Sequence, residues 1–507
     1  MVGEVLQMFF TVEVWTSLIV GTLAGMVVGA LPGLSASMAV ALLIPITFRM
    51  GTAAGLTLLA AVYTSAIYGG SITACLIHTP GTPSSAATAL DGFPLTKQGQ
   101  GLKAVGISTV SSMIGGTFSA LMLLFIAPPL AKISLLFSSL EYFLLALFGL
   151  TIIGSLAGDS MVKGLMSGLL GMLVGCIGLD VMNGTPRYTF GVIALESGIQ
   201  LIPAMIGLFS ISQVMIAVED LVKGKKVILD NPSALLKGKV LPTRQEMKQI
   251  LPTVGISSVI GLLIGIMPGA GADIGSWVAY NTAKKRSKHP ERFGHGAIEG
   301  IAASEAANNA VTGGAIIPLL TLGIPGSGVT AIMLGGLMIK GLVPGNDLFV
   351  AQGDITYTMI LGFLVANILM GVIGLLVAKQ VVKVSVVPMI ILCPIIVALS
   401  AIGSFAINNS IVDVYIMVIF GLIGYFARKT GFATAPVVLG LILGPMAEKN
   451  WRQALMFSRG DMLGYFFSRP ISIILALLVI IGLFSPILVK LFNKKATGSS
   501  EITAQED

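Results

Sequence analysis

The chain has 507 residues, of which 55% are hydrophobic and only 10% are charged. Soluble proteins carry about 25% charged residues, so this composition excludes a soluble globular protein and is typical of a membrane protein with several spans. The net charge of +7 fits the positive loops that orient membrane proteins. No polar domain is present to carry a basic surface, so no nucleic-acid partner is expected.

Long apolar segments follow one another along the chain, and their length favours helices over a β-barrel. They run over 14–48, 53–78, 103–127, 136–157, 162–180, 190–220, 250–282, 297–322, 326–343, 355–379, 386–407, 411–427, 432–446 and 470–492. A crossing helix needs about 20 apolar residues, and several of these segments are shorter than that or are interrupted. We therefore expect an all-α polytopic membrane protein of about 10–12 transmembrane helices, in two repeated halves with Pro-Gly-broken or re-entrant helices.

Two basic loops indicate the topology of the second half. Seven Lys or Arg residues lie within 221–248 and five within 284–292. The positive-inside rule places both loops in the cytoplasm, so the segment 250–282 between them is expected to enter the membrane and return, with its turn near Pro268. The alternative is one long kinked crossing, which would leave one basic loop outside.

The interruption of that segment has a counterpart in the first half. The glycines and proline of "GMVVGALPGL" (25–34) match those of "GLLIGIMPGA" (261–270) at an offset of 236 residues. Further on, "YGGS" at 68–71 matches "TGGA" at 312–315, and "TPGT" at 79–82 matches "IPGS" at 324–327, at offsets of 244 and 245. Duplication explains this order. We predict a first membrane repeat over 1–220, a basic cytoplasmic linker over 221–249, a second repeat over 250–493 and a polar disordered tail over 494–507.

Pro-Gly breaks inside apolar helices have a physical consequence. Unwinding frees backbone N–H and C=O groups, which lipid cannot satisfy, so they must meet protein, water or a ligand. Helix N-termini attract anions and unwound carbonyls can hold Na⁺, as in secondary transporters built from repeats. The alternative is a packing kink, since Gly25 and Gly29 also have the G-x-x-x-G spacing of close helix contacts.

Polar residues cluster beside these breaks. His78 precedes the first Pro-Gly loop and could relay a proton or simply end a helix. Asp273 is an acid within an apolar segment, and such acids are usually functional; it would serve a cation or a proton, or else a structural pairing. Glu305 shares a helix face with Asn308 and Asn309, whose amides could bind a carboxylate or Na⁺, or hydrogen-bond between helices.

Enzyme motifs are absent from the sequence. Neither Gly-Lys pair, at 224–225 and 238–239, is followed by Ser or Thr, so there is no Walker A loop. No H-E-x-x-H or C-x-x-C motif occurs either. The chain is therefore not expected to be an enzyme, and no cofactor is expected beyond a coupling ion, Na⁺ or H⁺.

The same segments carry a family resemblance over nearly the whole length. They are "GALPGLSAS", "HTPGTPSSAATALDGFPLTKQGQ", "NGTPRYTFG", "GIMPGAGADIGSWVAY", "FGHGAIEGIAASEAANNA", "IPLLTLGIPGSG" and "LGLILGPMAE". With them the chain resembles the TctA-type large membrane subunit of the tripartite tricarboxylate transporters. In the family pattern a proline usually precedes the glutamate of "EAANNA", whereas this chain has Ser304, which puts the local helix geometry there in doubt.

The resemblance implies a multi-pass permease subunit of the bacterial inner membrane. It implies two partners, a small membrane subunit of about four helices and a periplasmic solute-binding protein, and Na⁺- or H⁺-coupled uptake of organic carboxylates such as citrate. A stand-alone permease or exporter of small anions, working without a binding protein, is the alternative.

The residues at the breaks are the candidate site. The substrate-binding candidates are Gly33, Ser35, Ser37, Thr79, Gly81, Thr82, Ser84, Gly269, Gly271, Asn308, Asn309, Gly326 and Ser327. Asp273 and Asn308 are the candidates for cation coupling, with Na⁺ possible at the same breaks.

Overall fold

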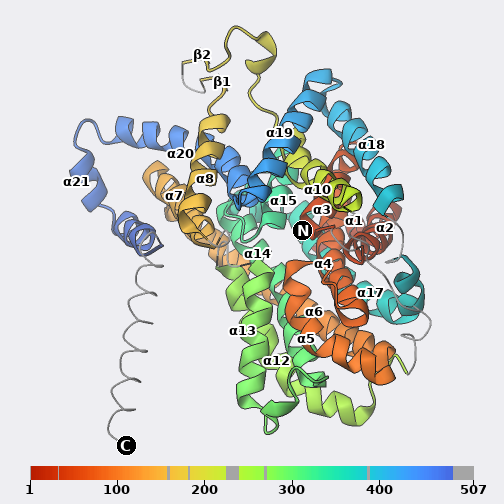
Figure 1. Cartoon of the computed structure of the whole chain (residues 1–507). Coiled ribbons are helices and arrows are strands. Elements are labelled where there is room, and N and C mark those ends of the chain that lie inside the picture. Colours follow the sequence, from red (N-terminus) through yellow and green to blue (C-terminus); the bar gives the residue numbers. More distant parts are fainter. Residues whose placement is uncertain are drawn as a thin grey trace, which may run out of the picture. The chain divides into compact units, whose positions relative to one another are not determined.

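A computed structural model describes residues 2–31, 34–156, 160–180, 183–223, 239–267, 271–384 and 389–482. The chain divides into two compact units (Figure 1). Unit 1 comprises residues up to 135 together with 200–426, and unit 2 comprises 136–199 together with the residues from 427 onward. The predicted tail and residues 224–238 of the predicted linker lie outside the described residues, and the boundaries of the two repeats stay a prediction.

Unit 1 is helical throughout its described part. Its helices are α1 (Val2–Phe9), α2 (Val12–Gly29), α3 (Ala36–Thr47), α4 (Thr52–Ile77), η1 (Pro83–Ser85), α5 (Ala86–Leu95), η2 (Thr96–Gln100), α6 (Gly101–Ile133), η3 (Ser134–Leu136, at the boundary with unit 2), α9 (Leu201–Ile206), η5 (Gly207–Ile211), α10 (Ser212–Val222), α12 (Arg244–Ile266), α13 (Gly271–Arg286), η6 (Pro290–Arg292), α14 (Ile298–Leu322), α15 (Gly328–Ile339), α16 (Asn346–Val350), α17 (Gly353–Val384), α18 (Met389–Asn408) and α19 (Ile411–Lys429).

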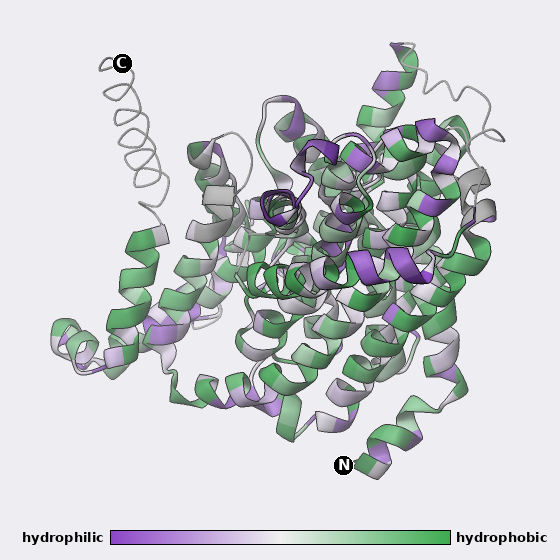
Figure 2. Cartoon of the chain, turned by 90° about the horizontal axis from the view of Figure 1, so that it is seen from below, coloured by the Kyte–Doolittle hydropathy of each residue, from purple (hydrophilic) through white to green (hydrophobic). Residues whose placement is uncertain are grey.

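The prediction of an all-α polytopic membrane protein is confirmed. Eight helical segments of the described chain are long and apolar enough to cross a membrane. This number is below the expected 10–12 because several apolar helices, among them α3 and α15, are too short to cross on their own. Hydrophobic residues dominate the helices (Figure 2).

The first half begins with a broken hairpin. α2 runs beside α4 in the same direction, because Gly21, Gly25 and Gly29 each lie against α4 at successively later positions. A Cβ on Gly29 would lie 2.1 Å from the carbonyl oxygen of Ala66, so only glycine permits this approach. α3 then leads back to the start of α4, where the backbone N–H of Gly51 donates to Glu13 at the start of α2 over 2.6 Å.

The second half repeats this arrangement. α12 runs parallel to α14, with Gly261 against Ala307 and Gly265 against Val311. α13 returns antiparallel to α12: a cavity of about 360 Å³ is lined both by the first turns of α12, near Gln249, and by the last turn of α13, near Arg286. The structure therefore agrees with the predicted hairpin, and the basic residues of 239–248 and 284–292 flank the same end of α12 and α13 (Figure 1).

The two hairpins have opposite orientations. The directions follow from close contacts at glycines. α17 runs parallel to α4, as the contacts Thr57–Gly362 and Tyr68–Gly374 show. α17 runs antiparallel to α6 (Gly116–Asn367, Met113–Gly371), and α6 runs parallel to α14 (Gly115–Ala306, Ser119–Gly313). α4 is therefore antiparallel to its counterpart α14, which makes the halves an inverted repeat. The two halves also interlock, because the long helix α6 of the first half packs mainly on α14, and the long helix α17 of the second half packs on α6 and α4.

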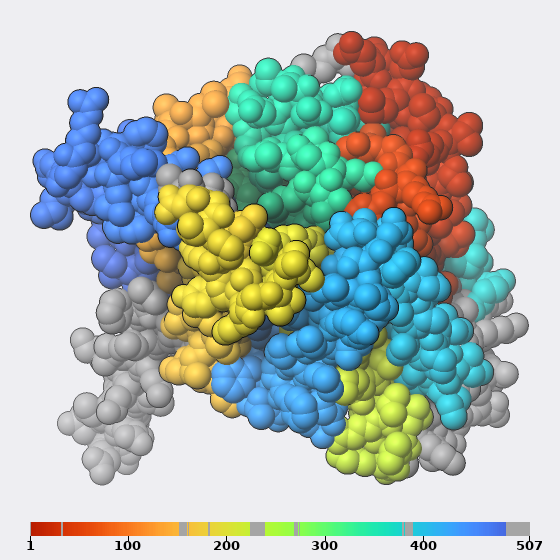
Figure 3. Space-filling model, turned by 90° about the horizontal axis from the view of Figure 1, so that it is seen from above, coloured from red at the N-terminus to blue at the C-terminus, as the bar shows by residue number. Residues whose placement is uncertain are grey.

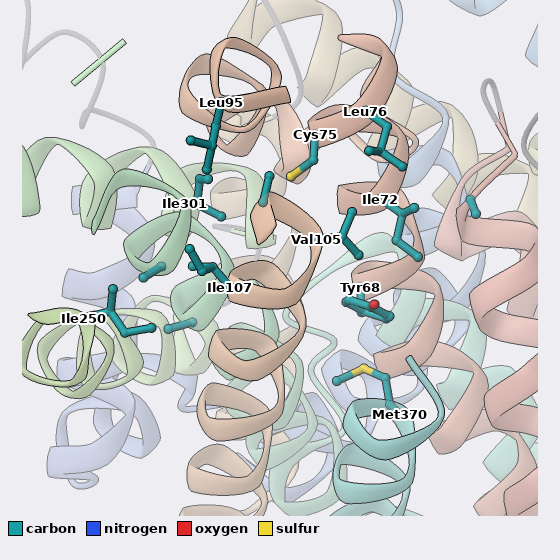
Figure 4. Close-up of a cluster of buried hydrophobic side chains, with 14 of the residues drawn as sticks. Tyr68, Ile72, Cys75, Leu76, Leu95, Val105, Ile107, Ile250, Ile301 and Met370 are labelled. Carbon is teal, nitrogen blue, oxygen red and sulfur yellow. The ribbon is translucent and has the colours of Figure 1, made fainter. Parts of the chain in front are cut away.

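The core lies around α4 and α14, whose residues are almost all buried. One buried apolar cluster joins Tyr68, Ile72 and Cys75 of α4 to Ile301 of α14 and Val105 of α6 (Figure 4). The outermost helices differ, since α18 and α19 expose side chains such as Ile390, Ile402 and Phe426. These two helices lie next to each other on one face of unit 1, as expected for a lipid-facing surface (Figure 3).

Unit 2 contains α7 (Ser139–Leu156), α8 (Met161–Gly175), the short antiparallel pair β1 (Gly178–Leu179) and β2 (Pro186–Arg187), η4 (Ile193–Leu195), α20 (Thr434–Phe457) and α21 (Met462–Phe467). Gly171 and Gly440 bring α8 and α20 into backbone contact. Arg187 binds Glu448 through both guanidinium nitrogens, at 2.5 and 3.1 Å. Hydrogen bonding to this carboxylate raises the pKa of Arg187 above its usual range.

Candidate functional site

Two Pro-Gly loops with the same backbone plan follow the central helices. α4 ends at His78 and α14 at Gly323, and both residues have a left-handed conformation, with φ of 55° and 70°. Four residues later Thr82 and Ser327 begin the next helix, each in a capping box with a hydroxyl residue three positions on. His78 is therefore a helix-ending residue, the simpler of the two roles its sequence position suggested, and its counterpart 245 residues later is glycine.

Each Pro-Gly loop lies against the broken end of the preceding helix in its own half. A Cβ on Gly81 would lie 2.2 Å from the carbonyl oxygen of Gly29, and one on Gly326 would lie 2.9 Å from that of Gly265. The backbone N–H of Gly81 donates to the carbonyl of Gly70 over 3.1 Å. Residues that are equivalent in the sequence repeat therefore make equivalent contacts in the structure.

The two breaks lie at similar depths along the central helices. Gly29 contacts α4 at Ala66 and Gly265 contacts α14 at Val311. Between these levels the hydroxyl of Thr64 on α4 faces the amide oxygen of Asn309 on α14, 3.3 Å away. Ala66 is two residues after Thr64 on α4, and Val311 is two residues after Asn309 on α14, so each break lies about 3 Å from this pair along the helix axis. Because α4 and α14 are antiparallel, these two displacements point in opposite directions, so the two breaks lie about one helical turn apart in depth near the middle of the central helices.

The pair at this centre comes from equivalent positions, because Thr64 and Asn309 are 245 residues apart. The Thr64 hydroxyl has one proton, and its shorter contact is to Asn367 of α17, at 2.6 Å. A Cβ on Gly116 of α6 would lie 1.8 Å from that same Asn367 oxygen, so glycine makes room for it. Sequence reasoning missed Thr64 and Asn367, although the offset applied to Asn309 would have indicated Thr64.

Two buried amides near the centre are not satisfied. Asn308 and Asn309 are fully buried. Among the described residues, the amide oxygen and nitrogen of Asn308 and the amide nitrogen of Asn309 have no hydrogen-bond partner. A buried polar group without a partner costs about 1–3 kcal/mol, and such groups are rare in native proteins. Donors and an acceptor are therefore available here for a ligand.

The predicted first-half residues divide between two places. Ser35 caps α3 and accepts from the N–H of Met38 at 3.2 Å, and Ser37 lies half-buried in the first turn. α3 packs on α15 of the other half, whose cap Ser327 is 3.3 Å from the hydroxyl of Tyr63. The remaining residues are in the Pro-Gly loop: the Thr79 hydroxyl donates to the carbonyl of Ile77.

The loop of the first half meets the return arm of the second. α13 packs on η1, which contains Ser84, and α14 contacts η1 as well. Ser84 and Thr82 are buried, with 3.1 Å between their hydroxyls. The return arm of each half thus faces the Pro-Gly loop of the other half.

Some predicted residues are not placed by the structure. Gly33 and Gly269 lie outside the described residues. Gly271 and Asp273 belong to the first turn of α13, but the side chain of Asp273 is also outside the described part. The cation role of Asp273 therefore stays a prediction.

Asp91 holds the two halves together at the basic end. One of its carboxylate oxygens accepts from the backbone N–H groups of Gly294, Gly296 and Ala297, at 2.8–2.9 Å. The other accepts from the hydroxyl of Tyr280 at 2.9 Å. Asp91 is completely buried and fully engaged with protein, so its role is structural.

Taken together, the two breaks and the central helices provide the N-terminal ends of α3, α13 and α15, two groups of hydroxyls and the unpartnered amide atoms of Asn308 and Asn309. Helix N-termini and amide N–H groups favour anions. Carbonyl, amide and hydroxyl oxygens can bind a hard cation. These groups could therefore donate hydrogen bonds to a carboxylate and supply oxygen ligands to a small cation.

Comparison with known proteins gives the family. The model of the tripartite tricarboxylate transporter TctA family matches residues 16–439. An uncharacterized 52.8 kDa protein in the TAR-I ttuC' 3' region of Agrobacterium vitis is 35% identical over 488 residues, covering 96% of this chain and 95% of that protein. A second uncharacterized protein, in the TAR-II ttuC' 3' region of the same organism, is 40% identical over 201 residues, covering 40% of this chain and 83% of that protein.

No solved structure matches the chain. The family match, however, includes both broken hairpins and both Pro-Gly loops. The chain belongs to the TctA family of the tripartite tricarboxylate transporters and is a multi-pass membrane component of a tricarboxylate transport system.

Proposed function

We propose that this chain is the permease that moves an organic tricarboxylate across the bacterial inner membrane, driven by a gradient of Na⁺ or H⁺. One observation supports the proposal: two inverted, broken hairpins end about one helical turn apart along the central helices, which carry buried amide atoms of Asn308 and Asn309 that no described residue satisfies. In secondary transporters such paired breaks bind the substrate near the midplane, and the repeats move relative to one another.

The substrate would be held by hydrogen bonds and helix dipoles rather than by fixed positive charges. The capping hydroxyls of Ser35 and Ser327, and the amides of Asn308 and Asn309, all occur at or near the breaks. Unwound N–H groups at Gly33, Gly81, Gly269 and Gly326 would add donors. The proposed site residues include no Lys or Arg, so a coupled cation would have to offset the substrate charge.

The cation would bind to oxygen atoms at the same breaks. Asp273 in the first turn of α13 is the proposed anionic ligand, with Asn308 and unwound carbonyls as neutral ligands. Binding of substrate and cation together would let the loaded site move while the half-loaded site stays in place, which is the basis of coupling.

Two partners complete the proposal. A tripartite system includes other subunits, and we assign them as a small membrane subunit of about four helices and a periplasmic solute-binding protein that delivers the substrate. The alternative is a permease or exporter that works alone.

Uptake measurements separate these possibilities. Labelled di- and tricarboxylates are offered to cells that lack their own uptake systems and express this chain alone, or this chain with the proteins encoded beside it. Gradients of Na⁺ and H⁺ are imposed in turn. Uptake that requires the partners supports the tripartite assignment and identifies substrate and ion. Uptake by the chain alone would contradict the role of the binding protein, and no uptake of any carboxylate would contradict the proposal.

A further inference from the structure

One carboxylate in the core has a role that the substrate site does not explain. Glu305 lies on α14, one turn before Asn308, and its side chain is completely buried. One of its oxygens accepts a hydrogen bond from the hydroxyl of Thr88 on α5. The other accepts from the hydroxyl of Ser112 on α6, at 2.8 Å. Ser71 of α4 contributes a third hydroxyl nearby.

Among the residues that the structure describes, no positive charge pairs with this acid. The described ion pairs of the chain do not include Glu305. The other titratable side chains facing it are Tyr68 and Cys75 of α4, which are neutral at physiological pH. The polar groups of α5 and α6 that contact Glu305 are the hydroxyls of Thr88 and Ser112. An ionised carboxylate in such a site pays a desolvation cost of several kcal/mol.

The unpartnered amide of Asn308 is a second, independent observation. It lies close enough to Glu305 to affect the carboxylate, yet neither of its polar atoms has a partner with hydrogen-bond geometry among the described residues. Glu305, Ser112, Thr88 and Asn308 thus form a buried cluster of oxygen atoms and one amide, with one negative charge to be neutralised.

A proton fits this cluster better than a sodium ion. Na⁺ would need several oxygen ligands around a vacant position, whereas both carboxylate oxygens are already in hydrogen bonds and the neighbouring Ile301, Ala302 and Ala306 of α14 belong to a buried apolar cluster. A proton needs no added space. It converts the carboxylate into a carboxylic acid, whose O–H can donate to the unpartnered amide oxygen of Asn308.

We propose that Glu305 is the residue that carries the coupling proton. This inference rests on the proposed transport function and names its coupling ion. Glu305 takes up a proton from water on the outer side and returns it to water on the inner side, while no other bond forms or breaks. Because Thr88 belongs to the first half and Asn308 to the second, gaining or losing this proton changes the hydrogen bonds between the inverted halves, near the two breaks.

Glu305→Gln tests the proposal, because glutamine has the shape of the protonated acid but cannot release a proton. Two transport modes are compared in proteoliposomes containing the complete transporter. During exchange of labelled for unlabelled substrate, the carrier crosses in both directions with substrate bound, so Glu305 need not release its proton. Net uptake requires the proton to leave before the empty carrier returns.

The expected result is loss of accumulation with exchange retained. At zero membrane potential a pH difference of about one unit sustains about tenfold accumulation per coupled proton. Glu305→Gln should reduce this ratio to one, while exchange stays within about twofold of the wild type. Glu305→Asp, which keeps a titratable group, should restore part of the accumulation.

One control variant isolates the effect. Asp413 is another buried acid, whose carboxylate accepts from Asn408 at 2.8 Å at the start of α19, and Asp413→Asn should leave accumulation unchanged. Thermal unfolding in detergent shows whether each variant is folded.

Three outcomes would overturn the proposal. They are accumulation by Glu305→Gln, loss of exchange in a folded Glu305→Gln protein, and wild-type accumulation that follows a Na⁺ gradient but not a pH gradient. If the wild type transports no carboxylate in either mode, the proposed function itself fails and this inference fails with it.

Discussion

Replacement of Gly81 by alanine should destabilise the contact between the first Pro-Gly loop and the broken end of α2. The new Cβ would lie 2.2 Å from the carbonyl oxygen of Gly29 and 2.7 Å from the Cα of Gly70. Non-bonded carbon atoms prefer about 3.5–4.0 Å, so the backbone would have to move by roughly 1 Å. Both neighbours are main-chain atoms, which cannot rotate away.

The expected cost follows from these distances. Overpacking of a buried site costs about 1–3 kcal/mol, and this change should reach the upper end because the hydrogen bond from Gly81 to Gly70 would also be strained. Thermal unfolding of the purified protein in detergent measures the loss, and uptake measured in parallel should fall, because the loop forms part of the proposed site.

Gly255→Ala is the matched control. Gly255 lies within α12, and no heavy atom lies within 4 Å of its missing Cβ, so alanine should be neutral or stabilise the helix by about 0.5–1 kcal/mol. If Gly81→Ala unfolds at the same temperature as the wild type and transports normally, the close packing of break and loop is not required and the reasoning is refuted.

Two further predictions concern buried polar groups. Asn308→Ala or Asn309→Ala should abolish carboxylate uptake while the protein remains inserted and folded, because the unpartnered amides serve the ligand; normal uptake by both variants would contradict this. Asp91→Ala should destabilise unit 1 by about 3 kcal/mol or more, because three backbone N–H groups and the Tyr280 hydroxyl lose their acceptor. Each unsatisfied group costs about 1–3 kcal/mol. An unchanged unfolding temperature would contradict this prediction.

The sequence predicted those features that depend on local backbone chemistry. Pro-Gly and hydroxyl residues predicted where helices break and restart, and the structure places helix starts at Ser35 and Ser327. The basic loops predicted that 250–282 returns to its own side, and α12 and α13 form that hairpin. These signals are local, so one sequence carries them.

Contacts between distant segments could not be predicted in the same way. Nothing in the segment 101–133 indicates that α6 packs on α14, because its glycines would fit any close neighbour. The pairing of Thr88 with Glu305 joins residues 217 positions apart, and neither residue type specifies the other. Apolar segments continue across residue 136 without a change in composition, so nothing there predicts that 136–199 forms a unit with the C-terminal segment.

Accessibility of Ser37 tests the central claim, that the broken hairpins form one substrate site open to each side in turn. A cysteine is introduced at Ser37 after the three free cysteines, Cys75, Cys176 and Cys393, are replaced by alanine. Lys288→Cys, in the basic loop, is the control and should react only from the cytoplasmic side, regardless of substrate. The account predicts that a membrane-impermeant thiol reagent labels Ser37→Cys from either side and that a tricarboxylate protects it. Labelling from one side only, or labelling that the substrate does not change, would contradict the account.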